Sequence, residues 1–412
     1  MAAATSSVSF APTVSATYVK PYILARQFST LDHVTEGRCG WNVVTSHTNS
    51  SAQALGYDNI PAHDERYKSA DEYMDIVYKL WESSWADDSV LWEDDLAIDP
   101  AKVKKVEHKG TYFNVRGRHQ IHPSPQRTPV LFQAGTSRSG TAFAAKHAEA
   151  IFMNPATTKL CSAQISAARA EAASQGRDPS TLKFFPCIVP IIGRTEEEAK
   201  EKEAKAKSFG DMIGGLAQFS GYTGIDMSVF PLDEPFAASS LKGGAAIQAV
   251  LSSFEASVEG AEPWTPRRLG ERMALGGLHP SPVGSAEQVA DFFEHWINET
   301  DCDGFNVYVL RDPTVSVKVP LMKVTTGPTS RTQAPSKTSS TSSSRSYRSV
   351  ALCGKTMPSL RVLSGRTCSG TSTLPKTITG PSSSMGVIRV CLGVATRRKM
   401  RRTVNIQRRR ME

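Results

Sequence analysis

Residues 129–152, PVLFQAGTSRSGTAFAAKHAEAIF, predict a buried strand, a turn rich in hydroxyl groups and a helix in immediate succession. Residues 130–132 are a short apolar run, and Gly135 and Gly140 bracket the turn. Beyond the turn, apolar side chains recur at the spacing of one helix face. A strand that leads through a turn into a helix is the unit from which parallel-sheet α/β proteins are built.

The turn in this stretch is suited to holding an anion. The start of a helix leaves backbone N–H groups unpaired and carries partial positive charge. Thr136, Ser137 and Ser139 add side-chain donors at the same point. Gly140 is not followed by the lysine of a P-loop, so the spacing fits an ordinary capped turn as well as a phosphate site.

The preceding part of the chain also alternates between strands and helices. Residues 5–16 and 39–45 are expected to be strands, and residues 20–31 and 64–85 are expected to be helices. This order predicts an α/β protein with a largely parallel sheet.

Further elements are expected after residue 152. Residues 184–192, FFPCIVPII, predict a buried strand whose two prolines indicate a sheet edge or a bulge. Residues 195–207 predict a charged, solvent-facing helix. Ser285 and Gln288 form a capping-box pattern at the start of another helix, and residues 303–310 predict a last strand.

We expect one folded domain, residues 1–322, followed by a tail, residues 323–412. Within the domain, residues 208–280 are rich in Gly, Ser and Pro and only weakly periodic. Such a segment is typical of a lid or substrate-pocket insertion, and equally of a poorly ordered insert.

The charge of the chain is concentrated in the tail. Residues 323–412 contain 18 of the 48 Lys and Arg residues and one of the 40 acidic residues, so the domain itself is acidic. A composition dominated by Ser, Thr, Lys and Arg predicts a disordered tail. A nucleic-acid or nuclear-localisation arm and a spuriously translated segment are both compatible with it, and nucleic acid is not an expected partner of the domain.

The cysteines and the apolar runs bear on the cellular location. The seven cysteines are scattered and include no Cys-x-x-Cys pair, which predicts no disulfide framework, no metal site and a cytoplasmic, reducing location. No apolar run reaches the roughly 18 to 20 residues that cross a bilayer. The first 31 residues lack acids and are rich in Ser, Thr and Ala, so organelle targeting is the alternative.

Three motifs stand in order along the chain: GRCGWNVVTS at residues 37–46, AHDERY at residues 62–67 and QAGTS at residues 133–137. In this order and spacing they resemble the flavin-dependent monooxygenase family of nitrilotriacetate, EDTA and dibenzothiophene-sulfone monooxygenases, within the bacterial-luciferase-like superfamily. The resemblance extends over roughly residues 3–310.

The resemblance implies a luciferase-like (β/α)₈ barrel of the TIM type, with the active site at the carboxyl ends of the strands. The family begins about three strand-helix units ahead of Met1, and the match fades after Leu310. We therefore expect an incomplete barrel. Missing strands would expose sheet edges, which favour association into a homo-oligomer.

By resemblance, Ser137 is expected to hold the flavin phosphate, His63 and Tyr67 to line the flavin pocket, and Thr13 to lie beneath the isoalloxazine ring. Asn42 is a further candidate for facing the cofactor. His63 is the expected catalytic residue, because an imidazole donates and accepts protons near neutral pH. Without the motif, His63 would fit a helix cap, Tyr67 the core side of a helix, and Thr13 an ordinary strand position.

The activity that the resemblance implies is oxygenation by reduced FMN. O₂ is the co-substrate, one of its oxygen atoms enters a small organic substrate, and a separate NADH-dependent flavin reductase supplies the reduced FMN. The alternative is a non-catalytic remnant of the family that binds flavin weakly or not at all.

Overall fold

The centre of the computed structural model is a seven-stranded sheet of order β1-β2-β5-β6-β7-β10-β11. The structure describes residues 2–92, 96–236, 254, 263–308 and 390–392. All neighbouring strands pair in parallel except β10 and β11, which are antiparallel. The predicted α/β fold with a largely parallel sheet is confirmed. The strands are β1 (Thr13–Ser15), β2 (Gly40–Val44), β5 (Val130–Gln133), β6 (Ala150–Met153), β7 (Lys183–Ile188), β10 (Phe305–Val307) and β11 (Val390–Leu392).

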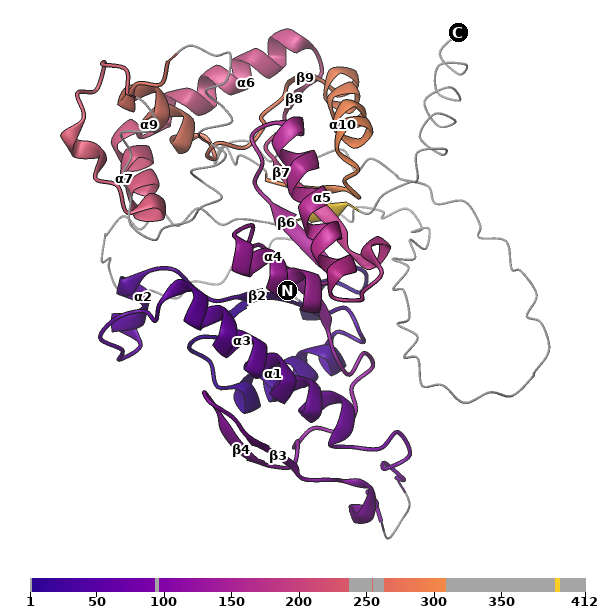
Figure 1. The fold of residues 1–412 in the computed structure, drawn as a ribbon. Coiled ribbons are helices and arrows are strands. Elements are labelled where there is room, and N and C mark those ends of the chain that lie inside the picture. The colour runs from indigo at the N-terminus through magenta and orange to yellow at the C-terminus, as the bar shows by residue number, and fades with distance from the viewer. Residues whose placement is uncertain (1, 93–95, 237–253, 255–262, 309–389, 393–412) are drawn as a thin grey trace, which may run out of the picture. The chain divides into compact units, whose positions relative to one another are not determined.

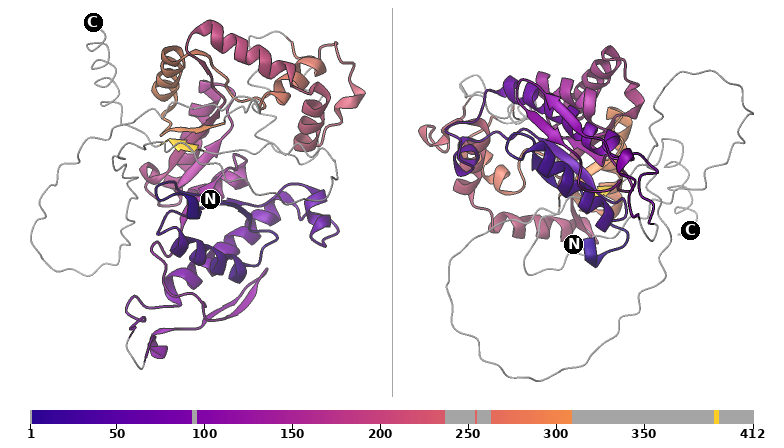
Figure 2. Two further views of the ribbon diagram at one scale, coloured as in Figure 1. Left: turned by 180° about the vertical axis from the view of Figure 1, so that it is seen from behind. Right: turned by 90° about the horizontal axis from the view of Figure 1, so that it is seen from below.

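Helices that follow the strands contact one another in chain order: α1 contacts α3, α3 contacts α4, α4 contacts α5, and α5 contacts α10. Figures 1 and 2 show this succession from three sides. A helix after each strand, in contact with the next helix, is the arrangement of the outer layer of a β/α barrel. The helices are α1 (Pro21–Val34), α2 (Asn49–Ala54), α3 (His63–Tyr78), α4 (Arg138–His147), α5 (Thr158–Ser174), α6 (Glu196–Ser208), α7 (Met212–Thr223), α9 (Pro266–Ala274) and α10 (Ala286–Thr300).

Polar caps determine where several helices begin. The Ser137 hydroxyl caps α4 and accepts a hydrogen bond from the backbone N–H of Gly140 at 3.1 Å. Thr195 caps the charged helix α6 in the same way, and Ala199 is its only buried residue, as expected for a solvent-facing helix. The predicted capping box of Ser285 and Gln288 is confirmed at the start of α10.

The core beneath the first strands is aromatic. Trp41 on β2 is fully buried, and its indole N–H donates to the carbonyl oxygen of Val14 at 3.0 Å. The rings of Phe28, Tyr73 and Trp81 lie with their centroids 5.6, 6.0 and 6.3 Å from that of Trp41. This cluster joins α1, α3 and the turn that follows α3 to β2.

The prediction of one strand over residues 184–192, near a sheet edge or a bulge, is wrong in its extent and in the edge position, because these residues form two strands and the first lies inside the sheet. β7 lies between β6 and β10, and its pairing passes from β6 to β10 directly after Pro186. The backbone N–H groups of successive residues point to the neighbouring strands on opposite sides. The missing N–H of Pro186 therefore removes one hydrogen bond and leaves the rest of the β-ladder intact. Pro190 separates β7 from β8 (Ile191–Gly193), which pairs with β9 (Val283–Ser285) in a second sheet.

Other differences are smaller. The first strand is limited to Thr13–Ser15 instead of residues 5–16. Helix α2 and a hairpin of β3 (Val106–Lys109) and β4 (Asn114–Gly117) were not predicted, because their polar sequences are typical of loops. Helix α3 ends at Tyr78 and continues as a π-helical turn, Lys79–Ser83.

The segment 208–280 contains α7 and α9, which pack closely against each other. A Cβ atom added at Gly215 would collide with the backbone oxygen of Gly270, so the two helix backbones touch there. Phe219 and Leu269 are fully buried in an apolar cluster that these helices share. The described part of the segment is therefore helical, with a core of its own.

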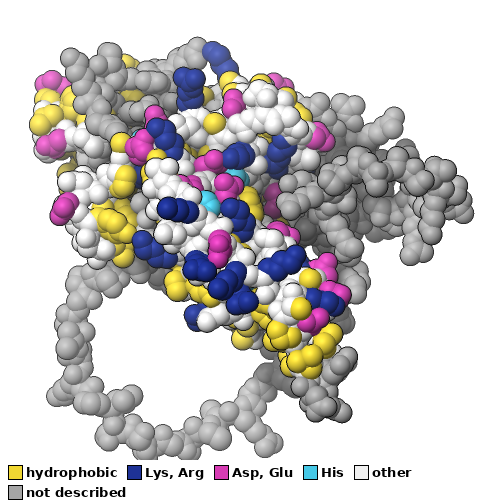
Figure 3. All heavy atoms as spheres, turned by 60° about the horizontal axis from the view of Figure 1, so that its bottom comes forward, with side chains coloured by type: hydrophobic (Ala, Val, Ile, Leu, Met, Phe, Trp, Pro, Cys, Tyr) yellow, Lys and Arg dark blue, Asp and Glu magenta, His cyan; other side chains and the backbone are white. Residues whose placement is uncertain are grey.

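The surface and the tail bear on the remaining predictions. On the face in Figure 3, Lys and Arg side chains lie among Asp and Glu side chains, so this face is not uniformly basic as a nucleic-acid-binding face would be. The predicted tail, residues 323–412, lies outside the described residues except for Val390–Leu392. Among the helices that are described, none has the length and apolar character of a membrane span.

Candidate functional site

The turn between β5 and α4 is tightly closed. A Cβ atom added at Gly135 would lie 2.5 Å from the hydroxyl of Tyr67 and 3.2 Å from the Cα atom of Gly140. The backbone N–H of Gly135 donates to Oε1 of buried Gln133 at 2.7 Å. A larger residue here would displace the Gln133 amide or the Tyr67 hydroxyl, and the N–H groups that begin α4 lie directly after this point.

The turn meets the start of α3. Nε2 of His63 lies 3.2 Å from Oγ of Ser137, and Nδ1 lies 2.9 Å from Oδ1 of Asp64. A carboxylate only accepts hydrogen bonds, so Nδ1 is the donor to Asp64, and Nε2 forms the second contact with the Ser137 hydroxyl. That hydroxyl in turn accepts from Gly140, so each polar atom in this chain of contacts has a partner of the right kind.

Asp64 links the two helices a second time. Its Oδ1 also accepts a hydrogen bond from the hydroxyl of Ser139 at 2.6 Å. The hydrogen bonds from Ser139 and then His63 hold the pKa of Asp64 below its usual value. Asp64 is therefore the anionic partner that fixes the orientation of the His63 ring.

Tyr67 lies one helical turn after His63. Its ring centroid is 5.1 Å from that of His63 in an edge-on arrangement and 5.7 Å from that of Phe143 on α4. Burial raises the pKa of Tyr67, against hydrogen bonds with Thr45 and Ser137 that lower it. The hydroxyl stays protonated at neutral pH and is a donor at the turn.

Thr13 and Asn42 form a second pair on neighbouring strands. They stand opposite each other in the register of β1 and β2, and the Asn42 amide nitrogen donates to Oγ1 of Thr13 at 3.0 Å. Asn42 is buried, and its amide oxygen has no hydrogen-bond partner within the described chain. A buried acceptor of this kind fits a ligand that offers an N–H donor.

The structure thus brings His63, Tyr67 and Ser137 together, and it separately pairs Thr13 with Asn42. The sequence interpretation missed Asp64 and Gln133. Both lie inside the quoted motifs, AHDERY and QAGTS, so their place in the motifs was the available indication of a role.

These residues fit a flavin mononucleotide. The helix start, the Ser137 hydroxyl and the protonated Tyr67 hydroxyl are donors for a phosphate. The unpartnered amide oxygen of Asn42 fits the ring N–H of an isoalloxazine. No group of three or more His, Cys, Asp or Glu side chains suited to a metal ion occurs in the described residues.

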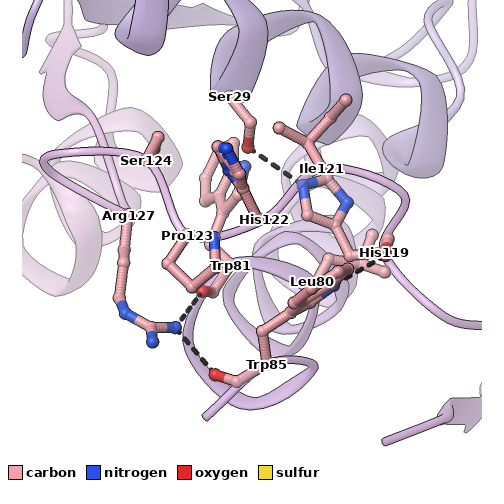
Figure 4. A pocket seen from close by; sticks show the side chains of 10 residues that line it. All are labelled: Ser29, Leu80, Trp81, Trp85, His119, Ile121, His122, Pro123, Ser124 and Arg127. Atoms are coloured by element: carbon pink, nitrogen blue, oxygen red, sulfur yellow. Dashed lines mark hydrogen bonds between the residues drawn. The ribbon is translucent and has the colours of Figure 1, made fainter. Parts of the chain in front are cut away.

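Two pockets lie away from this turn. The first, drawn in Figure 4, lies among α1, the π-helical turn and the loop before β5, and it contains none of the predicted site residues. The second is a groove of about 380 Å³ between the start of α5 and α10. The first pocket is lined by Ser29, Leu80, Trp81, Trp85, His119, Ile121, His122, Pro123, Ser124 and Arg127.

Comparison with known proteins shows the family of the chain. The model of the luciferase-like monooxygenase family matches residues 1–300. Dimethyl-sulfide monooxygenase of Hyphomicrobium sulfonivorans is 41% identical over 309 residues, which are 74% of this chain and 64% of that protein. Long-chain alkane monooxygenase of Geobacillus thermodenitrificans (strain NG80-2) is 38% identical over 309 residues, 74% of this chain and 65% of that protein.

Solved structures agree with the fold. The crystal structure of DmoA from Hyphomicrobium sulfonivorans superposes with a TM-score of 0.69 at 40% sequence identity, over 76% of this chain and 66% of that one. The chain spans about two thirds of the length of the relatives it matches. The expected barrel-type fold and the expected resemblance are confirmed. The chain belongs to the luciferase-like monooxygenase family.

Proposed function

We propose that the chain is a reduced-FMN-dependent monooxygenase that inserts one oxygen atom of O₂ into a small organic substrate. The observation that carries the proposal is the convergence of His63, Ser137 and Tyr67 at the start of α4. Reduced FMN is expected to come from a separate NADH-dependent flavin reductase, as the family resemblance implies.

Each residue has a role that follows from its contacts. Ser137 and the first N–H groups of α4 hold the phosphate, and the hydroxyl of Tyr67 donates to it. Thr13 and Asn42 contact the ring system, with the Asn42 amide oxygen as acceptor. When bound, reduced FMN supplies the electrons that activate O₂.

His63 is the proposed catalytic residue. Asp64 holds the Nδ1–H and orients the ring, while Nε2 faces Ser137 and is free to take or return a proton through that hydroxyl. A general acid or base is commonly an imidazole with one ring nitrogen bound to a carboxylate and the other ring nitrogen available for proton transfer.

Exclusion of water is assigned to the segment 208–280. The ring centroids of His47, in the loop after β2, and Tyr222, on α7, lie 6.3 Å apart, which supports a position of α7 near the carboxyl ends of the strands. A segment that covers that end of the strands would exclude water from the site during the reaction.

The proposal extends to location and partners. Cys39, Cys161, Cys187 and Cys302 are buried and form no disulfide with one another, which agrees with the proposed reducing compartment, the cytoplasm. The proposed partners are the small-molecule substrate and the reductase, with a second copy of the chain where sheet edges are exposed.

The test is FMN affinity, measured by fluorescence titration of the purified chain and its variants. Ser137→Ala is expected to weaken binding at least tenfold, because it removes a donor to the phosphate. Ser285→Ala is the matched control, since Ser285 caps α10 in the same way and each loss of a cap costs about 1 kcal/mol of stability. Equal affinities in both variants would refute the phosphate role of Ser137, and FMN binding without turnover would support the non-catalytic alternative.

A further inference from the structure

His147, the last residue of α4, is a buried histidine whose two ring nitrogens both have partners. Its side chain is 4% exposed. Nε2 lies 2.7 Å from Oδ1 of Asp71, and Nδ1 lies 3.0 Å from the hydroxyl oxygen of Tyr78. Asp71 and Tyr78 are two helical turns apart on α3 and so lie on one face of that helix. These three residues, the His147 cluster, join the end of α4 to α3.

The Asp71 carboxylate is the charged group of the His147 cluster. Both of its oxygens lie 2.7 Å from Nζ of Lys146. A carboxylate only accepts hydrogen bonds, so Nε2 of His147 is the donor to Oδ1. The hydrogen bonds from His147 and then Lys146 lower the pKa of Asp71 from 3.8 to about 2. Asp71 is therefore ionised at neutral pH, and a hydrogen bond to an ionised acceptor is one of the stronger kind.

A row of four rings connects the His147 cluster to His63. The ring centroid of Phe143 lies 4.8 Å from that of His147 and 5.7 Å from that of Tyr67. The centroid of Tyr67 lies 5.1 Å from that of His63. The first two rings of the row belong to α4 and the last two to α3, so the row crosses the interface between the helices. Because packed side chains leave little free space, a shift of α4 would displace the rings on α3.

The two helices are bound to each other at both ends of this interface. At the start, Nε2 of His63 lies 3.2 Å from Oγ of Ser137, and at the far end His147 binds Asp71. The step from His63 to Asp71 is about 12 Å of helix, and the step from Ser137 to His147 is about 15 Å. Hydrogen bonds are directional, whereas apolar contacts are not. The contact at the far end therefore limits how α4 can slide or turn against α3.

We propose that the His147 cluster is a positioning site for the reaction, which holds α4 at the place along α3 where Ser137 faces His63. The inference rests on the proposed function, because it assigns the residues that keep the proposed catalytic histidine and the phosphate turn together. A displacement of about 1 Å by a change far from the reacting atoms can cost about 10²-fold in rate. The His147 cluster acts through the helices and the row of rings.

The variants separate the ring of His147 from its nitrogens. His147→Phe keeps a ring against Phe143 and removes both hydrogen bonds. His147→Gln is the conservative replacement, because its amide supplies an N–H for Asp71. Tyr78→Phe removes one hydroxyl and leaves the bond to Asp71.

Two further variants are controls. Lys146→Gln removes the half-exposed cation from Asp71 and leaves His147 unchanged. His119→Phe is the matched control, because His119 is also a buried histidine, and its Nε2 lies 2.9 Å from the Ser29 hydroxyl on α1. It removes the nitrogens of a buried histidine outside the interface between α3 and α4.

The measurement is NMR of isotope-labelled histidine ring nitrogens in the flavin-free chain, with the His63 signals assigned from His63→Gln. We expect His147→Phe to shift the His63 resonances, because the Ser137 hydroxyl is no longer held against Nε2. His147→Gln and Tyr78→Phe should shift them less, and both controls should leave them at the wild-type positions. FMN affinity, measured by fluorescence titration, should fall severalfold in His147→Phe and stay unchanged in the controls.

Thermal melting distinguishes this role from a role in stability alone. If His147→Phe is unfolded, His147→Gln and Tyr78→Phe, compared with His119→Phe, carry the test. A folded His147 variant with the His63 resonances of the wild type would overturn the inference, and so would an equal shift in His119→Phe. If the wild type binds no FMN although His147→Phe shifts the His63 resonances, the proposed function fails and the positioning role stands. The two failures are therefore distinguishable.

Discussion

Nε2 of His63 lies 3.2 Å from Oγ of Ser137, although 74 residues separate them in the chain. The contact joins the first residue of α3 to the cap of α4. One contact therefore connects the proposed proton carrier to the proposed phosphate turn, and a change in either residue is expected to affect the other.

The first prediction concerns His63. Replacing it with alanine is expected to lower the rate of product formation about 10² to 10⁴-fold, the usual contribution of a general acid or base. FMN affinity should change much less, because Ser137 and Tyr67 remain. Single-turnover assays with chemically reduced FMN and a substrate, alongside FMN titration, measure both quantities, and unchanged product formation would rule out the role.

The second prediction concerns acid sensitivity at His119, which lines the pocket in Figure 4. Burial, and then the Arg26 charge, lower the pKa of His119 from 6.5 to about 4. The unfolded chain therefore binds more protons between these values. The contribution of His119 to the free energy of unfolding should be fully present above pH 6.5. It should be lost as the pH drops towards 4, which lowers the free energy of unfolding by about 3 kcal/mol at most.

Urea unfolding at several pH values measures this dependence. His119→Gln should reduce the pH dependence of the free energy of unfolding between pH 6.5 and 4, whatever the variant does to that free energy at pH 7. His295→Gln, which removes an exposed histidine from α10, is the control for the loss of one histidine. An equally steep fall in His119→Gln and in the wild type would assign the acid sensitivity to other groups.

The third prediction concerns the aromatic cluster. Trp41 is fully buried against three rings, so Trp41→Ala should lower the free energy of unfolding by about 3 to 5 kcal/mol. Trp92→Ala, at a position that is 74% exposed, should change it by no more than about 0.5 kcal/mol. Chemical denaturation compares the two, and a similar loss in both would contradict the role of the cluster.

The fourth prediction concerns the contact between α7 and α9. Gly215→Ala would insert a methyl group against the backbone of Gly270 and should force the helices apart. Gly221→Ala in the same helix meets nothing within 4 Å and is the matched control, expected to be neutral or slightly stabilising.

Hydrogen exchange of α7 and α9 reports the separation directly. If the segment covers the site as proposed, Gly215→Ala should also divert more O₂ to hydrogen peroxide and less to product. Faster hydrogen exchange in α7 and α9 with an unchanged product yield would confirm that the two helices pack at Gly215. It would refute the proposal that the segment covers the site.

The sequence predicted the elements whose patterns are local. The apolar run before Gly135, the hydroxyl groups after it and the helical spacing that follows were sufficient to expect β5, the turn and the start of α4. The helix was expected to continue to residue 152, but it ends at His147 and Ala150–Met153 form β6. The meeting of His63 with Ser137 followed from the motifs, because both lie after parallel strands whose ends share one edge of the sheet.

The remaining features depend on contacts between distant segments. Pro186 and Pro190 indicated a sheet edge or a bulge, because the neighbours that allow a proline inside a sheet cannot be recognised from the local sequence. Helices α7 and α9 were missed because their glycines lower helix propensity and are explained only by the close approach of the partner backbone.

The apolar cluster inside segment 208–280 has a consequence for how this family diversifies. Because Phe219 and Leu269 are buried within the segment, its outer and inner surfaces can accept substitutions without disturbing the strands that carry Thr13 and Asn42. If the segment covers the site as proposed, evolution can thus change this cover while the residues on β1 and β2 stay the same. Transplanting the whole segment from a relative is a more conservative way to redirect such an enzyme than altering strand residues one at a time.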